Sequence, residues 1–371
     1  MQVEWRVFEY NYPLSWRENT TMNNTTDTKI AVFGCGGWGK NIVRTMHKLG
    51  YLAAVIDPSE AGRTTARELV PDVAVFESME TVLEDSTISG VMIATPAETH
   101  FELAKAAILA GKDVYVEKPM TIDLEEAETL VQLAHAKGRL LMVGHLLEYH
   151  PAICKIEEMM QSGELGKVRY IVSNRLNLGK LRTEENVLWS FAPHDISVIV
   201  RLMQATPTEV VATGGTFLTP GVADTTVTQL AFENGSRAHI FVSWLHPFKE
   251  QKLVVVGDKK MVTFCDMTKE LMLHDKRVDW HEGMPVPVKG DGVVVEFSEE
   301  MPLDIECQHF ADCVANQTQP RTDGQNGVRV LSILHDAQKS LDSGGTPVIC
   351  KGDYCIPTIQ TVSRETVVAT S

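Results

Sequence analysis

The sequence predicts an α/β domain built on a parallel sheet, followed by an α+β domain with a large, mostly antiparallel open sheet. From residue 30 to residue 144, short apolar runs alternate with helical patterns, which is typical of parallel βαβ units. From residue 208 to about residue 274, β-prone runs follow one another with turn signals between them. The length of 371 residues also favours two domains, since single cores stop growing at about 250–300 residues.

Six short apolar runs define the strands of the first sheet, at 29–33, 52–56, 73–76, 91–95, 114–116 and 140–144. Between them we expect helices at 40–49 and at 97–110, where Gly111 ends the helix. A further helix begins after Asp123, a predicted N-cap, and ends at Gly138.

The second domain is predicted to begin with a helix at 151–160 and a strand at 168–175. A helix near 193–203 precedes the β segments, in which Asn234-Gly235 marks a hairpin turn. Another hairpin is expected at 256–262, and two helices, at 301–317 and 325–342, complete the domain.

The two ends of the chain are predicted to lie outside these domains. Residues 1–27 carry a polar Asn/Thr run and lack the basic start and apolar centre of a secretion signal. We therefore read 1–27 as a poorly ordered extension, 28–147 as the first domain, 148–350 as the second and 351–371 as a tail.

Charge and cysteine usage exclude several classes of function. The net charge of −15 argues against nucleic-acid or anionic-membrane binding, because no basic tract offsets it. No apolar run reaches the ~18 residues that cross a bilayer. The seven cysteines are scattered and form no CxxC pair, and the histidines show no HExxH spacing. A cytoplasmic protein without a metal site is the expectation.

The glycine-rich turn after the first strand has the spacing of a dinucleotide-binding fingerprint. It consists of Gly34, Gly36, Gly37, Trp38 and Gly39. The first glycine permits a sharp turn, the second brings backbone close to a pyrophosphate, and the last lets the helix approach the strand. The helix N-terminus then offers N–H groups to the phosphates. A structural glycine turn is the alternative.

Asp57, at the end of the second strand, indicates which dinucleotide is bound. A carboxylate there accepts hydrogen bonds from the ribose hydroxyls and repels a 2′-phosphate, which favours NAD over NADP. Arg63 lies nearby in sequence and leaves NADP open. In such sheets, ligands gather at the carboxyl ends of the strands, where Thr95-Pro96, Lys118 and His145 are also predicted to lie.

The combination of Thr95-Pro96 with His100, Glu117-Lys118-Pro119 and a late His194 resembles the Gfo/Idh/MocA family of nicotinamide-dependent sugar oxidoreductases. The resemblance covers about residues 29–345. Three stretches, 144–151, 173–180 and 189–195, are similar to the branch that oxidises C3 of UDP-N-acetylglucosamine or its uronic acid. By this resemblance, the product is next aminated and acylated in making lipid A or surface polysaccharide, and the protein forms a homo-oligomer through an exposed sheet face.

The resemblance implies that Lys118 and His194 are catalytic. His194 is the natural base for a secondary hydroxyl, and Lys118 can stabilise the developing alkoxide. From the residues alone, a surface lysine and a helix-capping histidine remain open. Many family members carry an aspartate four residues before this histidine, whereas Ser190 stands there in this sequence. Asp195 need not replace it, since adjacent helical residues point about 100° apart.

The remaining predicted site residues lie around the cofactor and the substrate. Arg175, Lys180 and Arg182 are cations that could bind a diphosphate, and a solvated loop balanced by Glu184 and Glu185 is the alternative. His100 is expected to order the loop beside Thr95. The other substrate-binding candidates are Asn174, Asn177, Trp189, His194 and Asp195, with His145 and Tyr149, which could equally be core.

We therefore expect NAD-dependent oxidation of the 3-hydroxyl of a UDP-N-acetylhexosamine. Two alternatives stay open. The first is a dehydrogenase or reductase of a free sugar or cyclitol, which does not need the cations between Arg175 and Arg182. The second is a regulator that binds NAD without catalysis, against which the presence of both Lys118 and His194 speaks.

Overall fold

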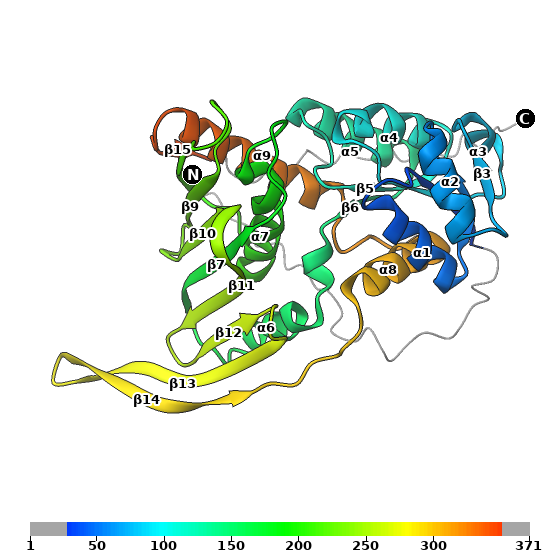
Figure 1. The fold of residues 1–371 in the computed structure, drawn as a ribbon. Coiled ribbons are helices and arrows are strands. Elements are labelled where there is room, and N and C mark those ends of the chain that lie inside the picture. The colour runs from blue at the N-terminus through cyan, green and yellow to red at the C-terminus, as the bar shows by residue number, and fades with distance from the viewer. Residues whose placement is uncertain (1–27, 351–371) are drawn as a thin grey trace, which may run out of the picture.

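The computed structural model describes residues 28–350 and places two sheets side by side, each with helices packed on it (Figure 1). The predicted extension 1–27 and tail 351–371 lie outside the described residues. The predicted fold class is confirmed: a parallel Rossmann-type sheet precedes a large, mostly antiparallel one.

The first sheet has six parallel strands in the order β3-β2-β1-β4-β5-β6. Its strands are β1 Ile30–Phe33, β2 Leu52–Ile56, β3 Ala74–Phe76, β4 Gly90–Ile93, β5 Asp113–Glu117 and β6 Leu141–Gly144. The order reverses direction between β1 and β4, so the crevice typical of ligand binding is expected beyond the carboxyl ends of these two strands.

Alternate side chains of β1 enter two separate hydrophobic clusters. Ala31 and Phe33 belong to the cluster with α3 (Glu80–Glu84), α4 (His100–Leu109) and α5 (Leu124–Lys137). Ile30 and Val32 belong to the cluster with α1 (Gly39–Leu49), α2 (Glu60–Leu69) and α8 (Pro302–Asn316). Helices therefore cover both faces, which explains why these strands are apolar along their length.

The second sheet has nine strands in the order β14-β13-β12-β11-β7-β10-β9-β8-β15, in which only β7 and β10 pair in parallel. Its strands are β7 Val168–Leu178, β8 Glu209–Gly215, β9 Thr225–Ala231, β10 Arg237–Ser243, β11 Leu245–Gly257, β12 Met261–Cys265, β13 Glu270–His281, β14 Met284–Val294 and β15 Val348–Ile349. The predicted Asn234-Gly235 turn joins β9 to β10, and Gly235 has a φ of +85°.

Three helices connect this sheet to the first domain: α6 Pro151–Gln161, α7 Val187–Met203 and α9 Gly324–Asp342. Helix α9 packs against α5, α7 and β8, and so lies between the two sheets. A short 3-10 helix, η3 (Leu146–Tyr149), follows β6.

Helix α7 begins at Val187, six residues before the predicted start at Pro193. The Asn186 side chain caps the helix by accepting a hydrogen bond from the backbone N–H of Trp189. Pro193 lies inside the helix, where its missing N–H removes one intrahelical bond. The earlier start matters because it places Ser190 and His194 on one helix, one turn apart.

Strands β13 and β14 continue beyond the end of β12 as a two-stranded arm (Figure 1). The sequence did not predict β14. Val278 pairs with Pro287 and Trp280 with Pro285, so one face of the arm is apolar, and Trp280 is 70% exposed.

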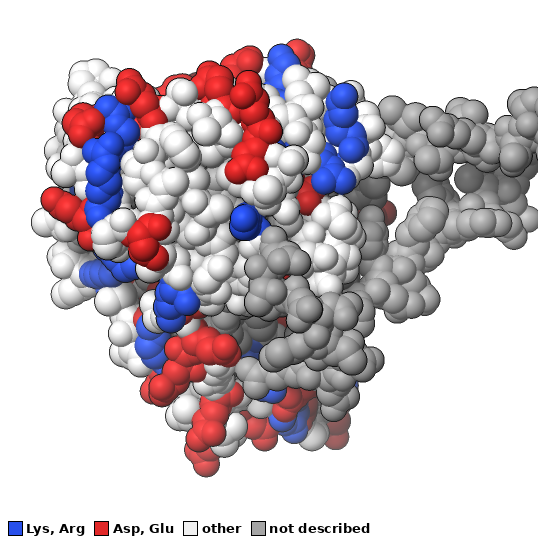
Figure 2. All heavy atoms as spheres, turned by 90° about the vertical axis from the view of Figure 1, so that its right-hand side faces the viewer, with Lys and Arg blue, Asp and Glu red and all other residues white. Residues whose placement is uncertain are grey.

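Acidic and basic side chains are interspersed on the face of the molecule that Figure 2 shows, where the basic ones stand singly or in small groups. Within residues 28–350, no helix is both long and apolar enough to cross a membrane.

Candidate dinucleotide and catalytic site

Two glycines of the turn are required by packing and two face open space. Gly34 has a φ of +93°, and a Cβ at Gly39 would lie 2.2 Å from the carbonyl oxygen of Gly34. A Cβ at Gly36 or Gly37 would meet no atom within 4 Å. Helix α1 starts immediately afterwards without a side-chain cap. The N–H groups of Lys40 and Asn41 donate to the carbonyls of Gly36 and Trp38, and the positive end of the helix dipole faces the turn. The turn fits the pyrophosphate of a dinucleotide.

Asp57 joins the end of β2 to this turn. One carboxylate oxygen accepts the backbone N–H of Cys35 at 2.8 Å, and the other accepts the N–H and hydroxyl of Ser59 at 2.9 and 2.7 Å. A Cβ at Gly62 would lie 2.1 Å from the Asp57 carboxyl carbon, so α2 needs a glycine there. The carboxylate is held where the fingerprint predicts a ribose contact.

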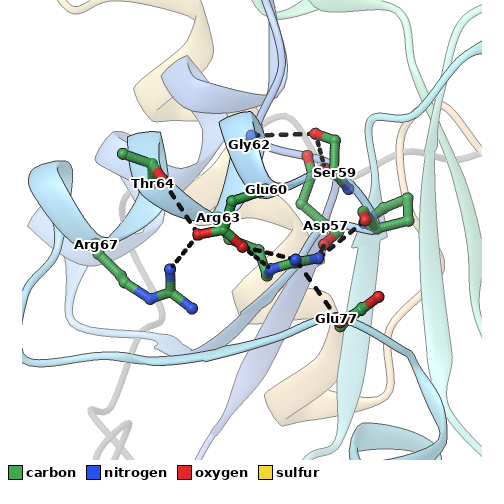
Figure 3. Close-up of polar contacts among 9 residues, drawn as sticks. Asp57, Ser59, Glu60, Gly62, Arg63, Thr64, Arg67 and Glu77 are labelled. Atoms are coloured by element: carbon green, nitrogen blue, oxygen red, sulfur yellow. Dashed lines mark hydrogen bonds and ion pairs between the residues drawn. The ribbon is translucent and has the colours of Figure 1, made fainter.

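The Arg63 guanidinium is bound by backbone carbonyls and by two nearby glutamates (Figure 3). Its guanidinium donates to the backbone carbonyls of Asp57 and Pro58 at 3.1 and 2.9 Å and pairs with Glu60 at 2.7 Å, with Glu77 at 3.7 Å. The arginine therefore supports the backbone beneath Asp57, and two carboxylates balance its charge.

Glu117 connects the strand that carries Lys118 to the glycine turn. Its carboxylate accepts the Trp38 indole N–H at 2.5 Å and the Tyr115 hydroxyl at 2.9 Å. The Tyr115 hydroxyl also lies 3.2 Å from Glu306 of α8. Burial, and then the charge of Glu117, raises the pKa of Glu306 well above its usual range. Sequence reasoning missed Glu306, because nothing in the spacing of α8 indicates that it reaches β5.

Lys118 and His194 come together between the end of β5 and helix α7. The Lys118 amine donates to the backbone carbonyl of Ser190 at 3.2 Å, one turn before His194. Burial lowers the pKa of Lys118. Burial, followed by the positive charges of Lys118, Arg175 and His145, holds the pKa of His194 well below its usual range. His194 is therefore neutral at physiological pH and able to accept a proton.

No carboxylate orients His194 from position 190. The Nδ1 atom of His194 and the hydroxyl of Ser190 are both buried and have no hydrogen-bond partner in the part of the chain described. Asp195 faces elsewhere: it accepts the Ser173 hydroxyl at 2.6 Å and two guanidinium nitrogens of Arg175 at 2.9 and 3.2 Å. Arg175 and Asp195 thus bind each other.

His145 leaves the end of β6, beside β5. Its Nδ1 lies 2.7 Å from the amide oxygen of Asn326 on α9, and the Asn326 amide donates to Glu148 at 3.2 Å. Sequence reasoning missed Asn326, which is distant in the chain, and it included Glu148 in the stretch 144–151 without giving it a role.

Several predicted substrate residues are engaged in structural contacts. Asn174 donates to Glu250 at 2.6 Å, and the Trp189 indole donates to Gln338 of α9 at 3.0 Å. Tyr149 is buried, with its hydroxyl 3.0 Å from that of Thr322. These three side chains support the fold around the site.

The other predicted residues lie at the strand ends and in the loop before α7. His100 bridges the carbonyls of Thr95 and Pro119 at 3.0 and 2.8 Å, which orders the loop as expected. Arg182 pairs with Glu185 at 2.7 Å, Lys180 is exposed, and the amide oxygen of Asn177 is buried without a partner among residues 28–350.

A cavity of about 890 Å³ lies away from these groups, between α1, α6 and α8. Tyr149, Glu157 and Arg321 are among its lining residues, and Arg321 is paired with Glu157 at 2.6 Å. Lys118, His194 and the residues of the glycine turn are not among the residues that line it. Among the described residues, no group of three or more potential metal ligands comes together.

A parallel sheet with this glycine turn, an acid after its second strand and a Lys–His pair at its carboxyl edge defines a dinucleotide-binding oxidoreductase. The sequence matches two family models, "Oxidoreductase family, NAD-binding Rossmann fold" over residues 28–145 and "GFO/IDH/MocA C-terminal domain" over residues 153–263. The chain belongs to the Gfo/Idh/MocA family, as its motifs predicted.

Relatives with different substrates match most of the chain. UDP-N-acetylglucosamine 3-dehydrogenase of Acidithiobacillus ferrooxidans is 27% identical over 85% of this chain and 97% of the relative. Scyllo-inositol 2-dehydrogenase (NAD(+)) of Bacillus subtilis is 26% identical over 79% of this chain and 87% of the relative. The chain is therefore similar to sugar-nucleotide and to cyclitol dehydrogenases.

Solved structures share the fold. A structure of the Acidithiobacillus ferrooxidans enzyme has a TM-score of 0.75 at 24% identity, covering 85% of this chain and 97% of that one. Levoglucosan dehydrogenase in complex with NADH has a TM-score of 0.76 at 17% identity, covering 88% and 99%.

Proposed function

We propose that the protein oxidises the 3-hydroxyl of a UDP-N-acetylhexosamine to a 3-keto sugar nucleotide, with NAD as oxidant. One observation carries this proposal. The Lys118 amine donates a hydrogen bond of 3.2 Å to the backbone carbonyl of Ser190, which lies on the same helix as His194, one turn before it. The bound nicotinamide supplies the hydride acceptor. His194, neutral in this site, takes the hydroxyl proton, and Lys118 stabilises the oxygen as negative charge develops on it.

Two cations before α7 are the proposed contacts for the diphosphate. Arg175 is bound by Asp195, so we assign this role to Lys180 and Arg182. Arg182 is held by Glu185 and only half-buried, which leaves donors for a phosphate oxygen. The similarity to UDP-N-acetylglucosamine 3-dehydrogenase supports a sugar nucleotide.

Oxidation of a cyclitol or free sugar is the second candidate. It is favoured by the similarity to scyllo-inositol 2-dehydrogenase and by the Arg175–Asp195 pair, which removes one of three predicted phosphate-binding cations. Such a substrate carries no phosphate and does not need Lys180 or Arg182.

A substrate panel separates the two candidates. We expect purified protein with NAD to form NADH with a UDP-N-acetylhexosamine and a trap for the ketone, and to ignore free cyclitols. In Lys180→Gln/Arg182→Gln protein, KM for the UDP-sugar should rise about a hundredfold or more with kcat little changed, since each of the two charged contacts contributes roughly 1.5–3 kcal/mol. Arg277→Gln, on the distant arm, is the control. Turnover of a cyclitol alone removes the sugar-nucleotide proposal.

The contacts of Asp57 and Arg63 support NAD over NADP. In Asp57→Asn protein, we expect NADH to bind about tenfold more weakly, because the charged ribose acceptor is lost, and NADPH to bind relatively better, because the repulsion of its 2′-phosphate is removed. Cofactor fluorescence titrations measure both. An unchanged ratio of the two affinities would show that Asp57 does not contact the ribose.

A further inference from the structure

Glu306 of α8 is a buried acid that the proposed reaction does not use. It is 0% exposed and reaches Tyr115 of β5, whose hydroxyl oxygen lies 3.2 Å from Oε2 of Glu306. The other carboxyl oxygen, Oε1, is buried without a hydrogen-bond partner among residues 28–350. An ionised carboxylate held in this way would be a buried and poorly compensated charge, whereas a protonated one is neutral.

The hydrogen bonds of Tyr115 indicate which of its two acidic neighbours carries a proton. Its hydroxyl has a single hydrogen and lies 2.9 Å from Glu117 and 3.2 Å from Glu306. Glu117 also accepts the Trp38 indole N–H at 2.5 Å and the backbone N–H of Lys118 at 3.2 Å, as an ionised carboxylate does. The Tyr115 hydrogen therefore goes to Glu117. The contact of 3.2 Å is then a hydrogen bond only if Glu306 is the donor.

The charges around Glu306 favour the same protonation state. Glu117 acts on it from β5 and Glu148 from η3, and both charges are negative. Burial, followed by the charge of Glu117, raises the pKa of Glu306 well above its usual range. Other titratable neighbours have raised pKa values and are uncharged at neutral pH: Tyr115, Tyr149 and Cys307.

The backbone of β6 fixes Tyr115 and Glu117 from the side. A Cβ at Gly144 would lie 2.5 Å from the Tyr115 hydroxyl oxygen and 2.9 Å from Oε2 of Glu117, so only glycine fits there. Close packing of this kind leaves the two side chains little freedom to turn away from Glu306. The direction of their hydrogen bonds therefore depends on the proton of Glu306.

We propose that Glu306 is a positioning residue for the dinucleotide: it donates its proton to Tyr115, which in turn holds the Glu117 carboxylate on the glycine turn. Trp38, which donates to Glu117, directly precedes α1. The chain of hydrogen bonds thus connects α8 with the turn that fits a pyrophosphate. An ionised Glu306 would instead add negative charge beside Glu117 and oppose an anionic cofactor. The inference rests on the dinucleotide binding that the proposed function requires.

Infrared difference spectra of the cofactor-free protein test the proton directly. Between wild-type and Glu306→Gln protein at neutral pH, we expect the carbonyl stretch of a protonated carboxylic acid to disappear. Glutamine has nearly the same shape as glutamate and keeps an N–H that can donate to Tyr115, so this variant should fold. Loss of an ionised-carboxylate band instead overturns the inference.

The indole N–H resonance of Trp38 reports whether Glu117 is held in place, and Trp38→Phe protein identifies it. A donor to the Tyr115 oxygen strengthens the hydrogen bond that Tyr115 makes to Glu117, so the resonance should move in Glu306→Leu protein and stay in place in Glu306→Gln protein. Asp312→Leu is the matched control, since Asp312 is a half-buried acid of the same helix that accepts the Gln308 amide at 2.8 Å. The control should leave the resonance in place.

Fluorescence titration with NADH measures the effect on the cofactor. The Kd should rise about tenfold in Glu306→Leu protein and stay within about twofold of wild type in Glu306→Gln and Asp312→Leu protein. Unchanged affinity or an unmoved Trp38 resonance in folded Glu306→Leu protein overturns the inference, and so does equal weakening in the two Glu306 variants. If Glu306→Leu does not fold, the infrared spectra and the NADH affinity of Glu306→Gln decide. Protein that binds NADH but oxidises no sugar refutes the proposed reaction and not the role of Glu306.

Discussion

Lys118→Met is expected to lower kcat by about 10³-fold, the largest loss that a single substitution in this protein should cause. Lys118 is half-buried beside α7, and its amine donates to the Ser190 carbonyl at 3.2 Å. Methionine keeps most of the side-chain volume and removes only the cation. The developing alkoxide then loses its counter-charge, while NADH binding, measured by fluorescence, should change little.

Lys112→Met is the matched control for this substitution. Lys112 is buried and directly precedes β5, whereas Lys118 directly follows the other end of that strand, and the Lys112 amine donates to the carbonyls of Asp85 and Ile88 at 2.6 and 2.9 Å. Its loss should lower the melting temperature and spare kcat, because two buried carbonyls lose their donor. Equal losses of kcat in the two variants would assign Lys118 a structural role.

The first domain was predictable because its signals are local. Each strand of the parallel sheet is a short apolar run, Asp123 and Gly138 mark the ends of α5, and the glycine turn follows β1 directly. Backbone conformation and capping depend on a few neighbouring residues, so these features can be read without knowing the fold.

The supporting residues of the site were not predictable, since their roles depend on contacts between distant segments. Glu306 reaches Tyr115 from α8, and Asn326 reaches His145 from α9. The sequence also suggested Arg175 as a phosphate contact, whereas the register of β7 turns it toward Asp195 on α7. Charge and spacing indicate what a side chain can bind, but tertiary packing determines which partner it meets.

Ser190→Asp should change the pH dependence of both activity and stability. The substitution places a carboxylate one turn before His194, where residues four apart are about 5–6 Å from each other. An opposite charge at that distance favours the protonated imidazole and raises the pKa of the histidine. The acid limb of kcat for oxidation should therefore move to higher pH, since His194 must be unprotonated to accept a proton. Lys118 also lies near position 190 and competes for the new charge.

The low pKa of His194 in the folded wild-type protein determines how stability changes with pH. As pH falls below about 6.5, the unfolded chain takes up a proton that the folded protein cannot hold, so the free energy of unfolding decreases. Burial lowers the pKa of His309 to about 4. This second histidine causes the same loss of stability in the wild type and in the Ser190→Asp variant, so it does not affect the difference between them.

Ser190→Asp should be less stable than wild type at neutral pH, because Ser190 is 4% exposed and the new carboxylate is buried. Its stability should then fall less steeply between pH 6.5 and 5, which denaturant titrations at several pH values measure. A parallel fall in the two proteins would mean that position 190 does not reach His194.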